Sequence, residues 1–273
     1  MLKQRLIVGI IGAIFMIAVL ILADVRFISA VLGIIAVIGL SEMYNVTGVL
    51  KTANKLCLFS YAYVFVMYLL IGFIDAAGLV AAVGLVVYGL CLLVYMVFNH
   101  EKCDFNTVCS LFVQTAYVSV LFAHIMLVRK LSFGEYTMWF IFVTAWLSDT
   151  LAYAVGLRFG RNKLMPTISP KKTVEGAIGG LAGSLIFNLI YGAICSLVFK
   201  LSVNYLALVI MALVVGVMSQ LGDLVASCIK REYGTKDYSN LLPGHGGILD
   251  RFDSVLFVAP VIYYFVIIFP VIA

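Results

Sequence analysis

The sequence predicts an all-α fold: a polytopic bundle of helices embedded in a membrane. Composition is the first reason, because 64% of the 273 residues are hydrophobic and 11% are charged, whereas a soluble domain carries about 25% charged residues. The second is that the apolar residues form long blocks, and one bilayer-spanning helix needs ~20 of them. The third is an uneven distribution of lysine and arginine between the blocks. No single globular core buries this much apolar sequence, so we expect several membrane spans.

Apolar windows predict about nine transmembrane helices. Their expected ranges are 5–23, 27–41, 56–74, 76–98, 107–128, 134–156, 175–199, 203–226 and 252–271. The first block is longer than the ~7–15 residues of a signal-peptide core, and no clear small-x-small cleavage site follows it, so we expect it to be retained. The second helix is short. The third and fourth are separated only by Asp75 and its neighbours.

Positive charge predicts the orientation of these helices. Nine spans place fourteen of the eighteen lysine and arginine residues on the side of the N-terminus and four on the other side. The four are Arg26, Arg129, Lys130 and Lys200. Because loops rich in lysine and arginine stay in the cytoplasm, we expect the N-terminus inside and the C-terminus outside.

The charged residues also predict a division of labour along the chain. Residues 1–130 are interpreted as transmembrane scaffold, because acids there, Glu42 included, fall at expected loops or helix ends. Residues 131–273 are interpreted as catalytic helices with cytoplasmic loops 157–174 and 227–251. Seven of the thirteen acids and ten of the eighteen basic residues lie between positions 149 and 253. The six cysteines are scattered without a CxxC pair, which favours inert apolar roles over disulfides or zinc.

Two acids in apolar blocks are candidate site residues. Asp149 lies about fifteen residues into the sixth block, where a carboxylate costs about 2.5–3.5 kcal/mol and normally faces a cavity or partner. A buried hydrogen bond to another helix is the structural alternative. Asp223 is followed by three polar residues at helical spacing that places all four on one face: Ser227, Lys230 and Arg231. That stripe suits a metal ion and phosphate oxygens, or an ordinary polar helix end.

The segment Leu242-Pro-Gly-His-Gly-Gly-Ile-Leu-Asp-Arg-Phe-Asp253 carries the densest signal. Its glycines allow close backbone approach to a ligand, and the helix that follows favours negative charge at its N-terminus. Asp250 and Asp253 are i, i+3 neighbours that share a helix face. Both acids could instead simply complement the helix dipole.

The loop between the sixth and seventh helices contains five cations, which topology or phosphate binding would explain. Ser169 before Pro170 resembles a helix start, with serine as the N-cap. Beyond it, the pairs Gly176/Gly180 and Gly179/Gly183 predict close helix packing. The chemical inventory of this half is acids able to hold Mg²⁺, fixed cations and a glycine-rich turn, without a Walker A motif. It favours a membrane enzyme that acts on phosphates with a divalent metal.

A longer pattern resembles a known family. The residues are Ser227-Cys-Ile-Lys230-Arg231, Lys236-Asp237, then Pro243-Gly-His245-Gly246-Gly247-Ile-Leu-Asp250-Arg251-Phe-Asp253. This looks like the signature of phosphatidate cytidylyltransferases, or CDP-diacylglycerol synthases, without departure at a fixed position. Ser148-Asp149, Ala152-Tyr153, Gly156 and Ser169-Pro-Lys-Lys-Thr-Val-Glu175-Gly176 also resemble the family. The compact chain resembles its bacterial branch.

The resemblance implies that CTP and phosphatidic acid give CDP-diacylglycerol and pyrophosphate, with Mg²⁺ and possibly a second, monovalent cation. It implies that four acids form the metal site: Asp149, Asp223, Asp250 and Asp253. Asp149 would be either a ligand or a supporting group. It implies phosphate or substrate binding by Ser227, Lys230, Arg231, Lys236, Asp237, His245, Gly246, Gly247, Arg251, Ser169, Lys171, Lys172 and Thr173. Asp223, Lys230, Arg231, Asp250 and Asp253 are the expected catalytic residues.

The expected setting is the bacterial inner membrane, with CTP arriving from the cytoplasm, phosphatidate entering from the bilayer, and a homodimer as the assembly. No nucleic-acid partner is expected. Two other functions remain open. A CTP-dependent polyprenol kinase would transfer the γ-phosphoryl group instead, and an ion-coupled transporter would use Asp149 and Asp223 for its ion. The intact signature argues against the kinase, and no inverted repeat supports the transporter.

Overall fold

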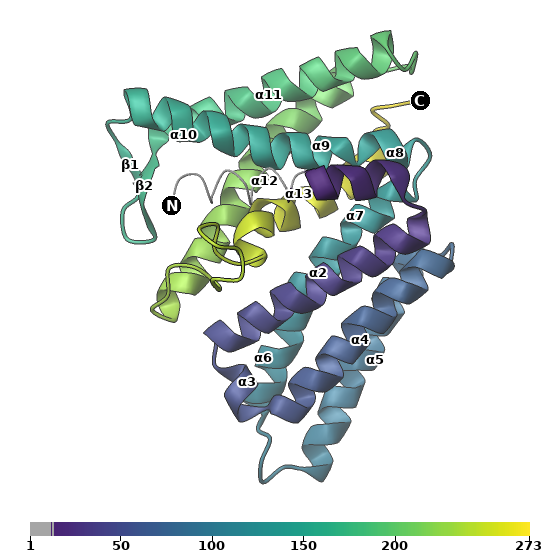
Figure 1. The fold of residues 1–273 in the computed structure, drawn as a ribbon, viewed down its shortest axis with the longest axis vertical. Helices are drawn as coiled ribbons and strands as arrows, with labels where there is room; N and C mark the ends of the chain where they lie inside the picture. Colours follow the sequence, from purple (N-terminus) through teal and green to yellow (C-terminus); the bar gives the residue numbers. More distant parts are fainter. Residues whose placement is uncertain (1–11, 13) are drawn as a thin grey trace. The chain divides into compact units, whose positions relative to one another are not determined.

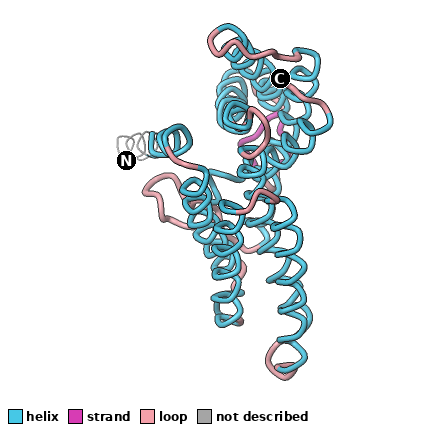
Figure 2. Tube along the Cα trace, turned by 90° about the vertical axis from the view of Figure 1, so that its right-hand side faces the viewer, coloured by secondary structure: helices cyan, strands magenta, loops and turns pink. Residues whose placement is uncertain are grey.

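The computed structural model describes residues 12 and 14–273, and its elements are almost all helices (Figures 1 and 2). Within that range, eight helical segments are long and apolar enough to cross a membrane. They span Val25–Val46, Asn54–Phe73, Ala77–Phe98, Phe105–Arg129, Gly134–Phe159, Val174–Leu197, Tyr205–Glu232 and Leu249–Ile268. These match the second to ninth expected helices, and the all-α membrane fold is confirmed. The first expected helix, 5–23, lies partly outside the described residues; residue 12 and residues 14–22 are helical, but the length of this helix is not described, so the number nine stays a prediction.

The chain forms two compact units. Unit 1 comprises the described residues up to 126 together with 233–251, and unit 2 comprises residues 127–232 and 252–273. The three boundaries along the chain fall within α7 (Leu121–Arg129), at the end of α12 (Tyr205–Glu232) and within α13 (Leu249–Ile268). The segment 233–251, which contains most of the glycine-rich motif, therefore packs with the N-terminal helices.

Unit 1 is built on α2 (Val25–Val46), α3 (Val49–Thr52), α4 (Asn54–Phe73), α5 (Ala77–Phe98) and α6 (Phe105–Thr115). A π-helical segment, η1 (Ala116–Val120), joins α6 to α7. The helices α2 and α4 run side by side (Figure 1).

Buried hydroxyl groups cross-link the helices of unit 1. The Tyr44 hydroxyl of α2 lies 2.5 Å from Thr115 Oγ1 of α6, and Tyr88 Oη of α5 lies 2.9 Å from the same atom. The Ser29 hydroxyl donates to the Tyr68 carbonyl across α2 and α4 at 2.5 Å. Interhelical bonds between small polar groups stabilise helix association where lipid and side chains are equally apolar.

The connection after α2 differs from expectation. A loop was expected over 42–55, but α2 continues to Val46, and α3 and α4 occupy most of the remainder. Glu42 is therefore inside a helix and 5% exposed, not at a helix end where its charge is solvated. The expectation was wrong because an acid near the end of an apolar block resembles a helix boundary, whereas this carboxylate has hydrogen-bond donors that replace water.

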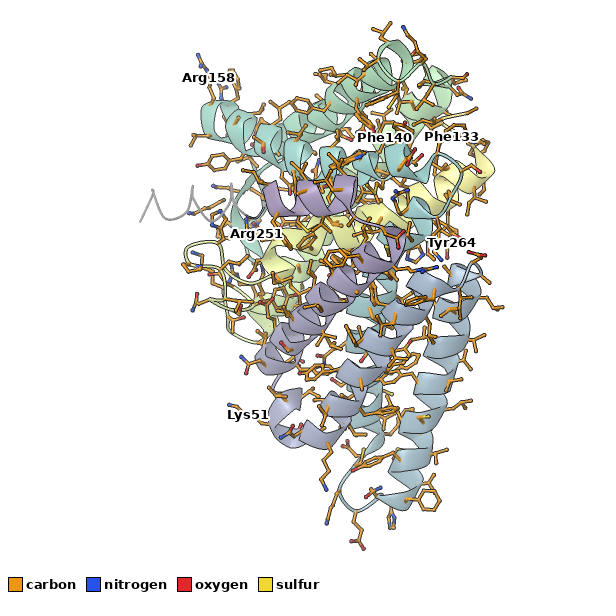
Figure 3. The ribbon with its side chains drawn as sticks, turned by 45° about the vertical axis from the view of Figure 1, so that its right-hand side comes forward. Lys51, Phe133, Phe140, Arg158, Arg251 and Tyr264 are labelled. Atoms are coloured by element: carbon orange, nitrogen blue, oxygen red, sulfur yellow. The ribbon has the colours of Figure 1, made fainter. Side chains whose placement is uncertain are left out.

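Unit 2 begins with α8 (Gly134–Thr137), α9 (Trp139–Phe142), a second π-helical segment η2 (Val143–Leu147) and α10 (Ser148–Phe159). It continues with α11 (Val174–Leu197), α12 (Tyr205–Glu232) and most of α13. In its apolar interior lies Phe140, which is labelled in Figure 3. Its ring packs edge-on against Tyr191, with ring centroids 4.8 Å apart.

Glycines bring α10 and α11 into close contact, as the small-residue pairs predict. A Cβ atom added at Gly179 would lie 2.6 Å from Val155 Cβ, and one at Gly180 would lie 2.9 Å from Ala152 Cβ. The Ser148 hydroxyl also donates to the Gly180 carbonyl at 2.8 Å. No larger side chain fits at these positions without displacing α10.

A short antiparallel hairpin connects α10 and α11. Its strands are β1 (Lys163–Met165) and β2 (Ser169–Thr173), drawn in magenta in Figure 2. The Glu175 carboxylate fixes the base of the hairpin by accepting from the backbone N–H groups of Arg161 and Asn162 at 3.0 and 3.2 Å. At the end of α10, Arg158 is exposed and points away from the helices (Figure 3).

The hairpin corrects the expected start of α11. Ser169 was expected to be the N-cap, but it begins β2, and Thr173 caps the helix by accepting from the Gly176 N–H at 3.1 Å. The fixed φ of Pro170 suits an extended strand as well as a first helical turn. A serine-proline pair therefore could not distinguish the two.

Candidate active site

The polar residues expected to form the site fall into two groups, one in each unit, and each group is described by itself. The carboxylate cluster is the name used here for Asp149, Asp223 and Asp253 of unit 2. The glycine loop is residues 238–248 of unit 1, which lead into α13.

Helix α12 positions the first member of the carboxylate cluster. The helix continues unbroken to Glu232, so Asp223, Ser227, Lys230 and Arg231 lie on one helix, as predicted. The Ser227 hydroxyl donates to Asp223 Oδ1 at 3.3 Å. Lys230 is only 7% exposed, and a buried ammonium group requires nearby anions.

Asp253 and Asp149 complete the cluster. Asp223, Lys230 and Asp149 all lie within electrostatic range of the Asp253 carboxyl group. Asp149 lies in the first turn of α10, directly after the π-helical segment η2, a kind of irregularity that is frequent at functional sites. The buried Ser254 hydroxyl donates to Asp149 Oδ2 at 3.1 Å. Asp149 of α10 and Asp223 of α12 thus lie within electrostatic range of Asp253 of α13.

The hairpin adds a cation to this cluster. Lys172 of β2 places its ammonium group 2.6 Å from Asp223 Oδ2, and each side chain is 27% exposed. Arg231 Nε donates to the Ile168 carbonyl at 3.3 Å, which ties the hairpin tip to the end of α12. Lys171 is exposed, and the Thr173 hydroxyl serves as the α11 cap.

The glycine loop folds back on itself in unit 1. Gly244 and Gly246 both have a φ of +78°, a conformation that favours glycine. The Leu242 N–H donates to the Gly246 carbonyl at 2.9 Å, and the His245 N–H donates to the Leu242 carbonyl at 2.8 Å. Among the described residues, His245 Nδ1 is buried without a hydrogen-bond partner, so this atom is available to a ligand.

Asp250 closes the glycine loop. Its Oδ2 atom accepts from the backbone N–H groups of Tyr238 and Gly247, each at 2.9 Å, and the residue is 8% exposed. A Cβ atom at Gly246 would lie 2.7 Å from the same oxygen. Asp250 therefore shapes the loop, whereas Lys236, Asp237 and Arg251 are exposed.

Sequence reasoning missed two groups of the site. Ser254 directly follows a candidate acid, but its hydroxyl was not considered. Glu42 was assigned to scaffold, although it accepts from Ser239 and from the start of α13. The signal for Glu42 is an acid within an apolar block, because a carboxylate there requires donors.

The residues present suit a small divalent cation. Within residues 12 and 14–273, no three histidine, cysteine or acidic residues are arranged to hold a metal together. Mg²⁺ does not need three, since it commonly binds one or two carboxylates, water and substrate phosphates. Asp223 already has a cation beside it, the Lys172 ammonium, and this contact stands in for the one that a metal ion would make.

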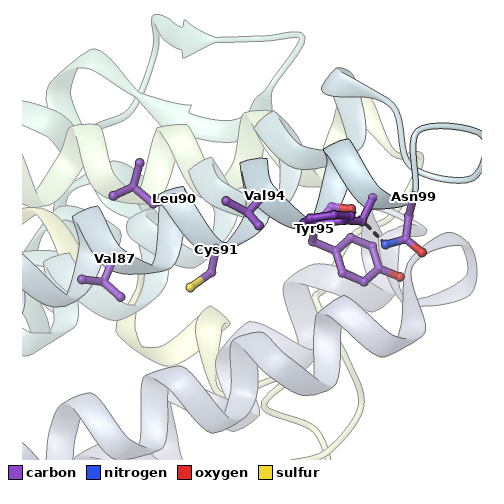
Figure 4. Close-up of a pocket in the computed structure, with 7 residues that line it drawn as sticks. Val87, Leu90, Cys91, Val94, Tyr95 and Asn99 are labelled. Carbon is purple, nitrogen blue, oxygen red and sulfur yellow. Dashed lines mark hydrogen bonds between the residues drawn. The ribbon is translucent and has the colours of Figure 1, made fainter.

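A separate hollow lies along α5. It is lined by six residues of that helix and by Asn99, which caps its C-terminal end; the six are Val87, Leu90, Cys91, Val94, Tyr95 and Phe98 (Figure 4). Its polar contact is the hydrogen bond from Asn99 Nδ2 to the Tyr95 carbonyl, at 3.0 Å. Without a charged residue in its lining, this surface suits acyl chains and not phosphates.

The fold and the clustered carboxylates and cations define a class: a polytopic membrane enzyme equipped for phosphate-bearing substrates. Comparison with known proteins narrows this class, because residues 3–269 match the sequence profile of the Cytidylyltransferase family. The chain belongs to this family and is a nucleotidyltransferase of phospholipid biosynthesis.

The names of similar proteins agree with this family assignment. A phosphatidate cytidylyltransferase of Bacillus subtilis is 35% identical over 98% of both chains. The enzyme of that name from Staphylococcus haemolyticus is 35% identical over 84% of this chain and 85% of its own. One from Staphylococcus saprophyticus is 41% identical over 63% of this chain and 64% of its own.

Proposed function

We propose that the chain is a phosphatidate cytidylyltransferase, which converts CTP and phosphatidic acid into CDP-diacylglycerol and pyrophosphate. The observation that carries the proposal is the placement of Asp149, Asp223 and Lys230 within electrostatic range of Asp253 in unit 2, with Lys172 in contact with Asp223. Carboxylates next to fixed cations are what nucleotidyl transfer requires, because its catalysis is mostly positioning and charge neutralisation. The relatives' names support the choice of phosphatidate and CTP as substrates.

In the proposed reaction, a phosphate oxygen of phosphatidate attacks the α-phosphorus of CTP. The bond from that phosphorus to the oxygen bridging to the β-phosphate breaks, and pyrophosphate leaves. A phosphate monoester with a second pKa of about 6 is largely dianionic near neutral pH. The nucleophile therefore arrives without its proton, and no side chain has to serve as general base.

The cations of unit 2 have distinct tasks in this account. Lys230 is buried beside the carboxylate cluster, which fixes its ammonium group in place for the triphosphate. Arg231 and Lys171 are exposed and suit the outer phosphate oxygens. In unit 1, His245 Nδ1 is proposed to bind one phosphate oxygen, and the exposed Arg251 is proposed to bind another.

Asp223 and Asp253 are the proposed ligands of Mg²⁺, and Asp149, which accepts from the Ser254 hydroxyl, is a further ligand or a supporting group. Bound Mg²⁺ would supply charge neutralisation for the triphosphate. The Lys172 ammonium would leave Asp223 when the metal binds and turn to a phosphate oxygen. A second, monovalent cation stays a prediction.

The proposed location is the inner membrane of a bacterium, with the site open to the cytoplasm. The connections after α2, α5, α10 and α12, together with the helix turns that flank them, carry twelve of the eighteen lysine and arginine residues, and such segments stay in the cytoplasm. CTP is soluble and would arrive from that side. Phosphatidate would reach the site with its acyl chains still in the bilayer.

CTP labelled separately at its α- and γ-phosphates tests the proposal. Purified protein in detergent is incubated with phosphatidic acid, Mg²⁺ and one of the two labelled forms of CTP. We expect the α-label in the lipid phase and the γ-label in released pyrophosphate. If the γ-label enters a lipid product, the result favours a polyprenol kinase. If neither label enters lipid with any lipid phosphate as acceptor, the result contradicts an enzyme of this class, and ion-coupled transport is tested next.

A further inference from the structure

Glu42 of α2 is a buried acid with three hydrogen-bond donors. Its Oε1 accepts from the Ser239 hydroxyl at 2.6 Å and from the Ile248 N–H at 2.9 Å. Its Oε2 accepts from the Leu249 N–H at 2.9 Å. The side chain is 5% exposed, and all of these residues belong to unit 1. Both ends of the glycine loop are thus held by one carboxylate.

The loop is shaped to receive this carboxylate. A Cβ atom at Gly247 would lie 2.5 Å from Glu42 Oε2, so any larger residue there would push the carboxylate out. One turn earlier on α2, a Cβ atom at Gly39 would lie 3.1 Å from Leu249 Cδ2. Glycines on both sides of the contact bring α2 and the start of α13 together.

The start of α13 needs an acceptor from elsewhere. The first N–H groups of a helix have no partner within it, and an N-cap serine, threonine, aspartate or asparagine usually supplies one. Ile248, which precedes α13, has an apolar side chain that cannot accept a hydrogen bond. Glu42 meets this need from another helix, and its negative charge also suits the helix N-terminus.

We propose that Glu42 is a positioning residue for CTP binding, acting through the glycine loop. The inference rests on the proposed function, since it assigns the loop to the triphosphate. By holding Ser239, Ile248 and Leu249, Glu42 fixes the segment that carries His245 and leads directly into Arg251. Residues interpreted as scaffold in the sequence thereby take part in the site.

The test is Glu42→Gln, which keeps the size of the side chain but replaces one acceptor oxygen with an NH₂ donor. That donor faces a backbone or hydroxyl donor of the loop. The KM for CTP should rise about 10-fold or more, the factor that one charge-assisted hydrogen bond corresponds to. The KM for phosphatidate should stay within about 2-fold, because no contact to the carboxylate cluster is altered. The matched control is Glu101→Gln, an exposed acid of the α5–α6 connection.

Hydrogen exchange provides a readout independent of activity. In Glu42→Gln the amides of Ile248 and Leu249 should exchange about 10-fold faster or more, with the amides of α11 unchanged. Ser239→Ala removes one of the three donors and keeps both amide contacts, so it should give a smaller rise in the same KM. It also keeps the proposal testable if Glu42→Gln does not fold.

Each outcome decides the proposal. A rise in KM for CTP alone, together with faster exchange at Ile248 and Leu249, supports it. Equal loss for both substrates, or unchanged exchange at these amides, would overturn it and leave Glu42 as a general stabiliser. If wild-type protein transfers no label from CTP, the proposed function fails, whereas the exchange measurement still reports whether Glu42 holds the loop.

Discussion

At the scale of single residues, the contact between Lys172 and Asp223 connects structure to activity most directly. Both groups are partly exposed, and such ion pairs contribute about 0–1 kcal/mol to stability. A contact worth so little to the fold is easily exchanged for a stronger one. We interpret Lys172 as the cation that neutralises Asp223 until substrate and metal arrive.

Lys172→Met tests this exchange. Removing the ammonium group leaves Asp223 without its competing cation, so the Mg²⁺ concentration for half-maximal activity should fall. The maximal rate should fall about 10-fold or more, since a charge-assisted phosphate contact is lost. Thermal unfolding in detergent should be nearly unchanged. A rise in the Mg²⁺ requirement with an unchanged maximal rate would contradict the interpretation.

Two acids of the carboxylate cluster, Asp149 and Asp223, could be selected from the sequence because a carboxylate is costly in an apolar block. Asp253 was selected by its place at a helix start. Ser254 and Glu42 were not, since a hydroxyl leaves little trace in hydropathy and a lone acid resembles a helix boundary. Their roles depend on partners far away in sequence, such as Ile248, which lies 206 positions after Glu42.

At the scale of secondary-structure elements, the contact between α10 and α11 supports the site. Helix α10 carries Asp149, and α11 follows the hairpin that carries Lys172. Small residues let the two helices approach closely, and van der Waals packing drives helix association in lipid. The position of both charged groups therefore depends on glycines that take no part in chemistry.

Gly179→Ala should show this dependence. The added methyl group would meet Val155 at 2.6 Å, and overpacking of this kind typically costs about 1–3 kcal/mol. Gly84→Ala in α5 is the matched control, because its methyl group would lie 3.5 Å from the nearest atom, in the Tyr63 ring. Thermal unfolding in detergent should drop for Gly179→Ala alone. An equal drop in both variants would mean that close packing of α10 on α11 is not the cause.

Element boundaries show where sequence patterns lose information. Apolar length identified all eight described spans, but neither the hairpin nor the two π-helical segments was expected. Strands of three and five residues are too short for a periodic signal. A π-helical segment adds a residue to a turn without changing hydropathy, so only the fold reveals it.

At the scale of the whole molecule, composition and the signature residues predicted the membrane fold and the family, and both are confirmed. The orientation of the N-terminus, the division at residue 130 and the homodimer stay predictions. No local sequence pattern conveys how the chain divides into the two compact units. Residues 233–251 pack with the N-terminal helices of unit 1, although they directly follow α12 in sequence.

The central claim is that the carboxylate cluster carries out cytidylyl transfer to phosphatidate. Its most direct test is the incorporation of α-labelled CTP into lipid by wild-type protein, by Asp253→Asn and by the exposed control Asp75→Asn. We predict a loss of about 10²-fold or more for Asp253→Asn, as expected for removal of a charged group that stabilises the transition state. Asp75→Asn should match wild type. Full activity in a folded Asp253→Asn protein would contradict the account.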